Sequence, residues 1–163
     1  MKMSKFYITT SIMYTNGPPH CGFAMELIQA DVLARYNRLK EVDTLFLTGT
    51  DEHGSTVAKA AQKAGADPQN FVDKIAEQVK ELINILNISN DDFIRTSDKK
   101  RHWPTAIKIW QLIERKGDLY KKKYKGLYCI GHESFIKKND LVSGLCPLHQ
   151  TEPEAIEEEN WFF

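Results

Sequence analysis

Hydrophobic and polar positions follow two alternating periods along the first part of the chain. Residues 5–12 alternate like a β-strand, and residues 44–48 form a second apolar, β-prone run. Each run ends in a turn of Gly, Pro or acidic residues and is followed by a helical pattern, over 22–40 and 56–64. Strand, turn and helix thus occur twice, which predicts parallel βαβ pairing in an α/β fold. Because ligands bind at the carboxyl ends of such strands, the two turns are the expected site.

Two further apolar stripes predict helices. One begins at Pro68 and runs to Leu86, and the other runs from Trp103 to Gly117. The Trp side chains of the second stripe suit core packing, with a base-stacking platform as the alternative. Beyond Leu119 the pattern changes to short strands and turns with a Cys/His set. We therefore expect a domain over 1–117 and a small module over 118–163.

Composition narrows the class of protein. The 163 residues are 42% hydrophobic and 27% charged, typical of a soluble globular chain, and no apolar run approaches the roughly 18 residues of a membrane span. The amino terminus shows no apolar or Arg-rich leader, so we expect a cytoplasmic protein that does not enter a membrane. The three Cys do not suit disulfide pairing, because two of them each have a His at metal-ligand spacing.

The formal net charge is zero, but the charges are segregated. Residues 99–138 are rich in Lys and Arg, whereas residues 139–163 are acidic. The basic segment predicts contact with nucleic-acid phosphates, and a solvated lysine face is an equally good interpretation.

The turn Pro18-Pro19-His20-Cys21-Gly22 leads directly into a predicted helix. Gly22 permits close approach of a ligand, and a helix amino terminus offers free N–H groups to an anion such as phosphate. A His there can donate a hydrogen bond to developing charge on phosphate oxygens. The alternative is that His20 only caps or packs against the helix.

Two Cys-x-x-His pairs lie in the last part of the chain, Cys129 with His132 and Cys146 with His149. Thiolate and imidazole ligands at this spacing suit one tetrahedral Zn²⁺. Four protein ligands leave no open position, so the ion would be structural. The alternative is a degenerate knuckle that keeps its turns without a metal.

Several motifs together resemble a known family. The segment 12–23 looks like the first nucleotide-binding motif of class I aminoacyl-tRNA synthetases, closest to methionyl-tRNA synthetase, and the similarity continues through 46–54, 91–96, the Cys/His pairs and 157–163. It covers essentially the whole chain. Two positions depart from the family pattern: Phe23 replaces the second His of the motif, and His132 replaces a knuckle Cys.

The resemblance implies a fold and a set of site residues. The fold would be the first half of a doubly wound, parallel, Rossmann-like nucleotide-binding domain, followed by a connective zinc-knuckle insertion. By the same resemblance, ATP would be bound by Pro19, His20, Gly22 and Phe23, with His20 the catalytic residue. Methionine would be bound by Ile12, Tyr14 and Asp51, the last holding the ammonium group. From the residues alone, Asp51 is as well explained as a turn or helix cap.

The implied activity is that of methionine–tRNA ligase. Methionine and Mg²⁺-ATP would form methionyl-adenylate, which is then transferred to tRNA(Met). The second half of the sheet, the lysine loop and the anticodon-binding domain of such enzymes are not in this sequence, so we expect a carboxyl-terminal half as a partner. Residues 2–5 spell most of the lysine motif, which we interpret as chance. The alternative from another class is a truncated, non-catalytic binding module that associates with tRNA or with a synthetase.

Overall fold

The computed structural model describes residues 5–132 and 134–163. The motif-like residues 2–4 lie outside this part of the chain. The chain divides into two compact units, one ending at Pro104 and the other spanning Thr105–Phe163. The sequence predicts a domain boundary after Gly117 instead. The two boundaries differ in whether the helix that begins at Trp103 belongs to the first or the second part of the chain. The boundary at Gly117 stays a prediction.

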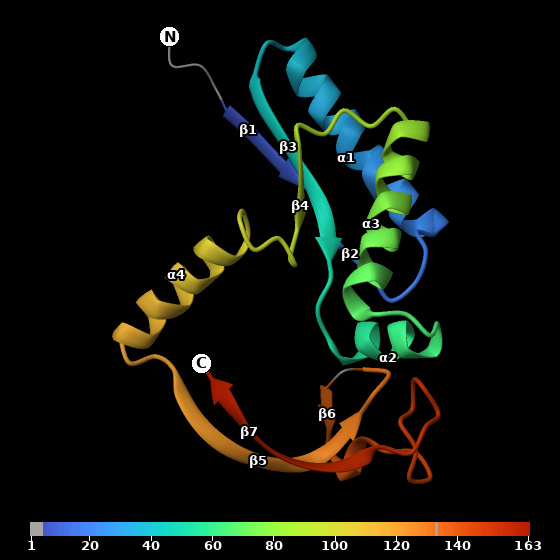
Figure 1. Cartoon of the computed structure of the whole chain (residues 1–163), viewed down its shortest axis with the longest axis vertical. Helices are drawn as coiled ribbons and strands as arrows, with labels where there is room; N and C mark the ends of the chain where they lie inside the picture. The colour runs from blue at the N-terminus through green and yellow to red at the C-terminus, as the bar shows by residue number, and fades with distance from the viewer. Residues whose placement is uncertain (1–4, 133) are drawn as a thin grey trace. The chain divides into compact units, whose positions relative to one another are not determined.

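The first unit is built on a parallel sheet. Strand β3 (Asp43–Asp51) lies at its centre and pairs in parallel with β1 (Lys5–Thr9), β2 (Met13–Tyr14) and β4 (Asp92–Arg95). The helices are α1 (Cys21–Leu39), α2 (Ser55–Lys63) and α3 (Pro68–Ile85), and α1 and α3 lie along the same side of β3 (Figure 1). The predicted parallel βαβ arrangement is therefore confirmed.

The strands differ in detail from the sequence prediction. The expected strand over 5–12 ends at Thr9 and resumes for two residues at Met13. Strand β3 extends to Asp51, beyond the apolar run that predicted it. Its paired length brings Asp51 into register with Tyr14.

The core of this unit lies between the sheet and the two long helices. Its larger cluster joins Phe23 and Leu27 of α1 to Ile75 and Val79 of α3. The cap of α3 follows the sequence rule, since Asp67 accepts hydrogen bonds from two N–H groups of the first turn and Pro68 follows it. Core packing thus fixes α1 on the sheet and, with it, the turn at its amino terminus.

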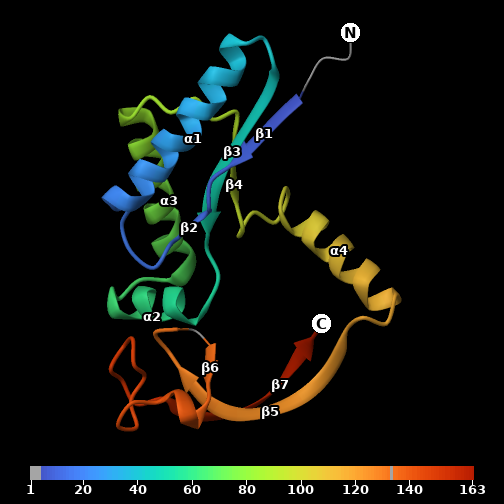
Figure 2. The same ribbon diagram turned by 180° about the vertical axis from the view of Figure 1, so that it is seen from behind.

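The second unit contains α4 (Trp103–Arg115, which starts at the boundary) and an antiparallel sheet of β5 (Tyr120–Cys129), β6 (Ser134–Ile136) and β7 (Glu154–Phe162), with a 3₁₀ turn at Lys138–Asp140. The expectation of short strands was wrong for β5 and β7, which have ten and nine residues. Figure 2 shows these two strands running together along a common curve. Both strands carry many charged side chains, so the sequence shows no long apolar or alternating run that would predict strands of this length.

The two Trp side chains of the α4 stripe do not enter a core among the described residues. Trp103 is 37% exposed and Trp110 is 42% exposed. Trp110 instead packs edge-on against Trp161 of β7, with ring centroids 5.5 Å apart. Among the described helices, none is long and apolar enough to cross a membrane.

Candidate functional site

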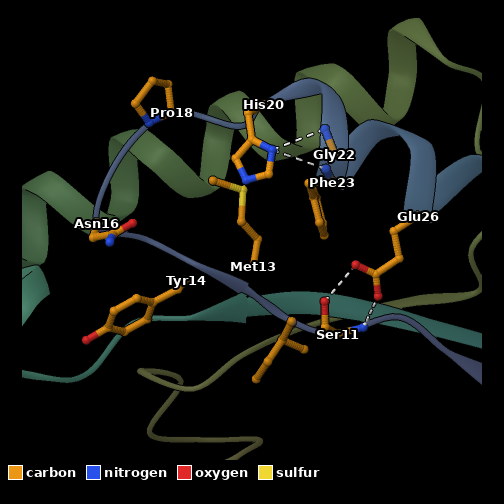
Figure 3. Close-up of a pocket in the computed structure, with 10 residues that line it drawn as sticks. Ser11, Met13, Tyr14, Asn16, Pro18, His20, Gly22, Phe23 and Glu26 are labelled. Atoms are coloured by element: carbon orange, nitrogen blue, oxygen red, sulfur yellow. Dashed lines mark hydrogen bonds between the residues drawn. The ribbon is translucent and has the colours of Figure 1, made fainter. Parts of the chain in front are cut away.

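His20 forms the amino-terminal cap of α1. Its backbone is extended, and its ring Nδ1 accepts hydrogen bonds from the N–H groups of Gly22 at 3.1 Å and Phe23 at 3.4 Å (Figure 3). A ring nitrogen that accepts carries no proton, so the proton of the neutral imidazole is on Nε2. The capping interpretation is therefore correct, but it leaves Nε2 as a donor. The two roles proposed for His20 use different nitrogens.

The sequence predicts free N–H groups at this helix terminus, and this prediction was wrong for two of them. The amides of Gly22 and Phe23 already donate to His20. A side chain at Gly22 would crowd that capping ring, since an added Cβ would lie 3.0 Å from two ring atoms. The absence of a side chain at Gly22 therefore preserves the cap.

An open pocket of about 370 Å³ lies beside this turn. It brings together five residues of the sequence prediction: Ile12, Tyr14, His20, Gly22 and Phe23. The exposed His20 ring is part of its wall, so the ring is not sealed beneath aliphatic neighbours. Phe23 is only 4% exposed and packs in the core with Leu27, so little of its side chain is accessible from the pocket.

Pro19 and Asp51, both predicted to bind ligand, do not line this pocket, whereas Pro18 does. The pocket wall therefore includes Pro18 and His20 but not the residue between them. Sequence reasoning missed five lining residues: Ser11, Met13, Asn16, Pro18 and Glu26.

Glu26 ties the loop between β1 and β2 to helix α1. Its two carboxylate oxygens accept from Ser11, the backbone N–H at 2.5 Å and the hydroxyl at 2.7 Å (Figure 3). Glu26 lies one helical turn after Gly22, and residues at that spacing share a helix face. Helical periodicity could therefore have predicted that Glu26 lines the same site as Gly22. These bonds fix the loop that carries Ile12.

The carboxyl end of β3 holds the second predicted group. Tyr14 pairs in register with Asp51, and the backbone N–H and hydroxyl of Thr15 each donate to the Asp51 carbonyl at 3.0 Å. Asp51 does not cap α2, because the cap is Gly54 and no side chain bonds there. Gly54 has a φ of 127°, and an added Cβ would collide with the Tyr14 hydroxyl. Tyr14, Asp51 and Gly54 therefore lie side by side.

The four Cys and His side chains that the sequence predicts as zinc ligands lie close together in the second unit. The ligand atoms of Cys129, His132, Cys146 and His149 all lie within 4.8 Å of one another. The sulfur-to-Nδ1 distances are 3.4 Å from Cys146 to His132 and 3.6 Å from Cys146 to His149. Zn–S and Zn–N bonds of normal length at a tetrahedral angle would place such atoms about 3.6 Å apart. The cluster therefore has the composition and spacing of a metal site.

The two sulfur ligands are buried and the two His are exposed. Desolvation raises the pKa of the Cys129 thiol, but hydrogen bonds, first that of the His132 backbone N–H, outweigh it and leave the pKa below its ordinary value. These bonds favour the thiolate, which is the form that binds a metal.

The basic segment is partly neutralised by the acidic one. Lys121 lies 3.5 Å from Glu159 and Lys125 lies 3.2 Å from Glu157, across the β5–β7 pairing. Lys121 also lies over the Trp161 ring at 5.2 Å. Cross-strand ion pairs of this kind support the sheet. They favour the solvated-face interpretation for these two lysines over phosphate contact.

Comparison with known sequences agrees with these features. A family model described as tRNA synthetases class I (M) matches residues 6–160. The methionine–tRNA ligase of Thermotoga maritima is 46% identical over 163 residues, covering 98% of this chain and 26% of that protein. That of Brucella suis is 41% identical over 167 residues, covering 100% and 32%. This chain thus spans between a quarter and a third of the length of these relatives.

Solved structures give the same result. The Mycobacterium tuberculosis methionyl-tRNA synthetase in complex with methionyl-adenylate matches with a TM-score of 0.91 and 38% identity, over 99% of this chain and 32% of that one. An Agrobacterium radiobacter LeuRS–tRNA complex matches with a TM-score of 0.79 at 20% identity, over 99% of this chain and 21% of that one, which shows a shared fold. The expected Rossmann-like α/β fold is therefore confirmed, and the chain belongs to the methionyl-tRNA synthetase family of class I.

Proposed function

We propose that this chain is the methionine-activating part of a methionine–tRNA ligase. In the reaction, a methionine carboxylate oxygen attacks the α-phosphorus of ATP, the bond to pyrophosphate breaks, and methionyl-adenylate forms. The methionyl group then passes to a ribose hydroxyl of tRNA(Met), and AMP leaves. The observation that carries the proposal is the His20 ring, fixed by its Nδ1 contacts in the wall of a pocket shared with Ile12 and Tyr14.

His20 would act as a hydrogen-bond donor to ATP. With Nδ1 occupied by the α1 amides, its Nε2–H can donate to phosphate oxygens as charge develops on them during attack. A donor held in place before reaction needs no reorganisation, which is why such groups stabilise transition states. Pro19 would shape the turn, and Gly22 and the edge of Phe23 would contact ATP.

Methionine would bind at the adjoining strand ends. Ile12 and Tyr14 would contact its side chain, and the Asp51 carboxylate would hold its ammonium group. The strand register that sets Tyr14 beside Asp51 supports this arrangement. Holding both substrates in one geometry lowers the entropic part of the barrier, so binding and catalysis would depend on the same residues.

The metals would have separate roles. Cys129, His132, Cys146 and His149 would hold one structural Zn²⁺, which the composition and spacing of the cluster fit. Mg²⁺ would enter with ATP and neutralise phosphate charge. A carboxyl-terminal half would complete the enzyme, which would act in the cytoplasm on tRNA(Met).

Methionine-dependent exchange of pyrophosphate into ATP tests the proposal. The enzyme that contains this chain, at its natural full length, should catalyse exchange only when methionine is present. Salt-sensitive tRNA binding without any exchange would contradict the proposal and support a non-catalytic binding module.

A further inference from the structure

A buried carboxylate lies next to the residue that would hold the methionine ammonium group. The Glu52 side chain has no solvent exposure, although it sits in an otherwise open turn between Asp51 and His53. It accepts four hydrogen bonds, from Arg95 Nε at 2.7 Å, Arg95 Nη2 at 2.9 Å, Thr50 Oγ1 at 2.6 Å and Ser97 Oγ. A buried charge is tolerated only when it is paired and hydrogen-bonded, and here both conditions are met.

Arg95 joins three elements through its planar guanidinium group. It ends β4, binds Glu52 with two nitrogens, and binds Asp73 of α3 at 2.5 Å. The hydrogen bond from Arg95 is the main cause of the lowered pKa of Asp73, and the bonds to both carboxylates raise the pKa of Arg95, that to Glu52 most. A rigid fork of donors restrains the position of its partners more strongly than a single ammonium group would.

Thr96, the residue after Arg95, connects Arg95 to Asp51 through hydrogen bonds. The Thr96 hydroxyl accepts the Glu52 backbone N–H at 2.8 Å and lies 3.4 Å from Asp51 Oδ1, to which it donates. The Thr96 backbone N–H donates to the Thr50 carbonyl at 3.2 Å. The Glu52 backbone and the Asp51 side chain are therefore both hydrogen-bonded to Thr96, which directly follows Arg95 in the sequence.

We propose that Arg95 is a positioning residue for methionine, which aims the Asp51 carboxylate through Glu52 and Thr96. This inference rests on the proposed function, in which Asp51 holds the ammonium group. Arg95 itself is directed at Glu52 and Asp73, so it acts through its neighbours. The position of His20 depends on the α1 cap instead, so the ATP side of the site does not rely on Arg95.

Variants of Arg95 in the full-length enzyme test this role. Arg95→Lys keeps the charge but loses the fork, and Arg95→Met loses both. Because small displacements of a binding group cost up to about 100-fold in rate, we expect kcat/KM for methionine to fall about 10-fold in Arg95→Lys and about 100-fold in Arg95→Met, chiefly through KM. The KM for ATP should stay close to that of the unmodified enzyme.

Arg38→Met is the matched control. Arg38 makes an ion pair of similar length but greater exposure, 2.6 Å to Asp91, and also bonds Ser89. Its partners lie just before the start of β4, whereas Arg95 ends that strand. The loss of this more exposed pair should weaken folding less than the loss of Arg95 does, and it should leave the KM for methionine unchanged. An equal rise in the KM for methionine in Arg38→Met and Arg95→Lys would show that the rise reflects lower stability alone. That result would overturn the proposal.

A second variant gives a further readout. Glu52→Gln keeps the shape of the side chain but removes the charge that Arg95 binds with two nitrogens, so its KM for methionine should rise as in Arg95→Lys. If the unmodified enzyme shows no methionine-dependent exchange, the proposed function itself fails. If it does, and the KM for methionine is unchanged in both Arg95 variants, only the positioning role is refuted.

Discussion

His20 offers a test that separates capping from catalysis, because its two ring nitrogens have different partners. His20→Ala removes both the acceptor of the Gly22 and Phe23 amides and the Nε2 donor. His20→Asn removes the donor at Nε2 but keeps a side-chain oxygen able to accept from the first turn, since Asn is among the best amino-terminal caps. The pair of variants therefore differs in the cap and not in the catalytic donor.

The expected magnitudes follow from these contacts. Loss of a cap costs about 1 kcal/mol of stability, so His20→Ala should be destabilised by about that amount and His20→Asn by little. Loss of one donor to a developing oxyanion costs roughly 100- to 1000-fold in rate, or about 2.7 to 4 kcal/mol in the barrier. Both variants should therefore lose activity to a similar extent.

The assay is methionine-dependent pyrophosphate exchange in the full-length enzyme, with urea unfolding as the measure of stability. Equal losses of activity in the two variants, with a stability difference only in His20→Ala, are the expected result. Exchange by His20→Asn within about threefold of the unmodified rate, against the 100-fold or larger loss expected for a missing donor, would refute the catalytic role. His20 would then be a helix cap alone.

Three other predictions concern the metal, the turn and the pH dependence. Metal analysis should find about one zinc per chain, and Cys146→Ser should reduce it, because the tetrahedral set loses a sulfur ligand; unchanged zinc would contradict the assignment. Gly54→Ala should raise the KM for methionine and cost about 1 to 3 kcal/mol of stability, because of its positive φ and the nearby Tyr14 hydroxyl; near-normal values would argue against this contact. The pKa of Asp31 is lowered from 3.8, since the bonds from Ser89 and Arg35 outweigh the opposing and larger single effect of desolvation. Its carboxylate therefore stabilises the fold above pH 3.8 and loses this effect as pH falls through the lower folded pKa, so Asp31→Asn should flatten the acid limb of urea unfolding. An identical acid limb in the variant would show that other carboxylates dominate.

Local patterns predicted the helices well and the strand β4 poorly. Helix α3 begins at Pro68, as the capping residues and the apolar stripe indicate. Strand β4 is four residues long and carries charge at both ends, Asp92 and Arg95, so it has no apolar run for a sequence pattern to detect. It exists because β3 supplies its hydrogen-bonding partner, which lies more than 40 positions away in the sequence.

The residues themselves determined the chemistry of this protein: the ligand types at 129, 132, 146 and 149, the Gly at 22 and 54, and the order of strand, turn and helix. These are local properties, because ligand identity, backbone freedom and periodicity are set by each residue and its near neighbours. Tertiary structure decided the rest. It placed the capped His20 ring in the wall of a pocket shared with Ile12 and Tyr14, set Asp51 beside Tyr14 instead of at a helix cap, and buried Glu52 against Arg95. Each of these depends on strand register or on the docking of α1 and α3, which long-range packing fixes and a single sequence does not display.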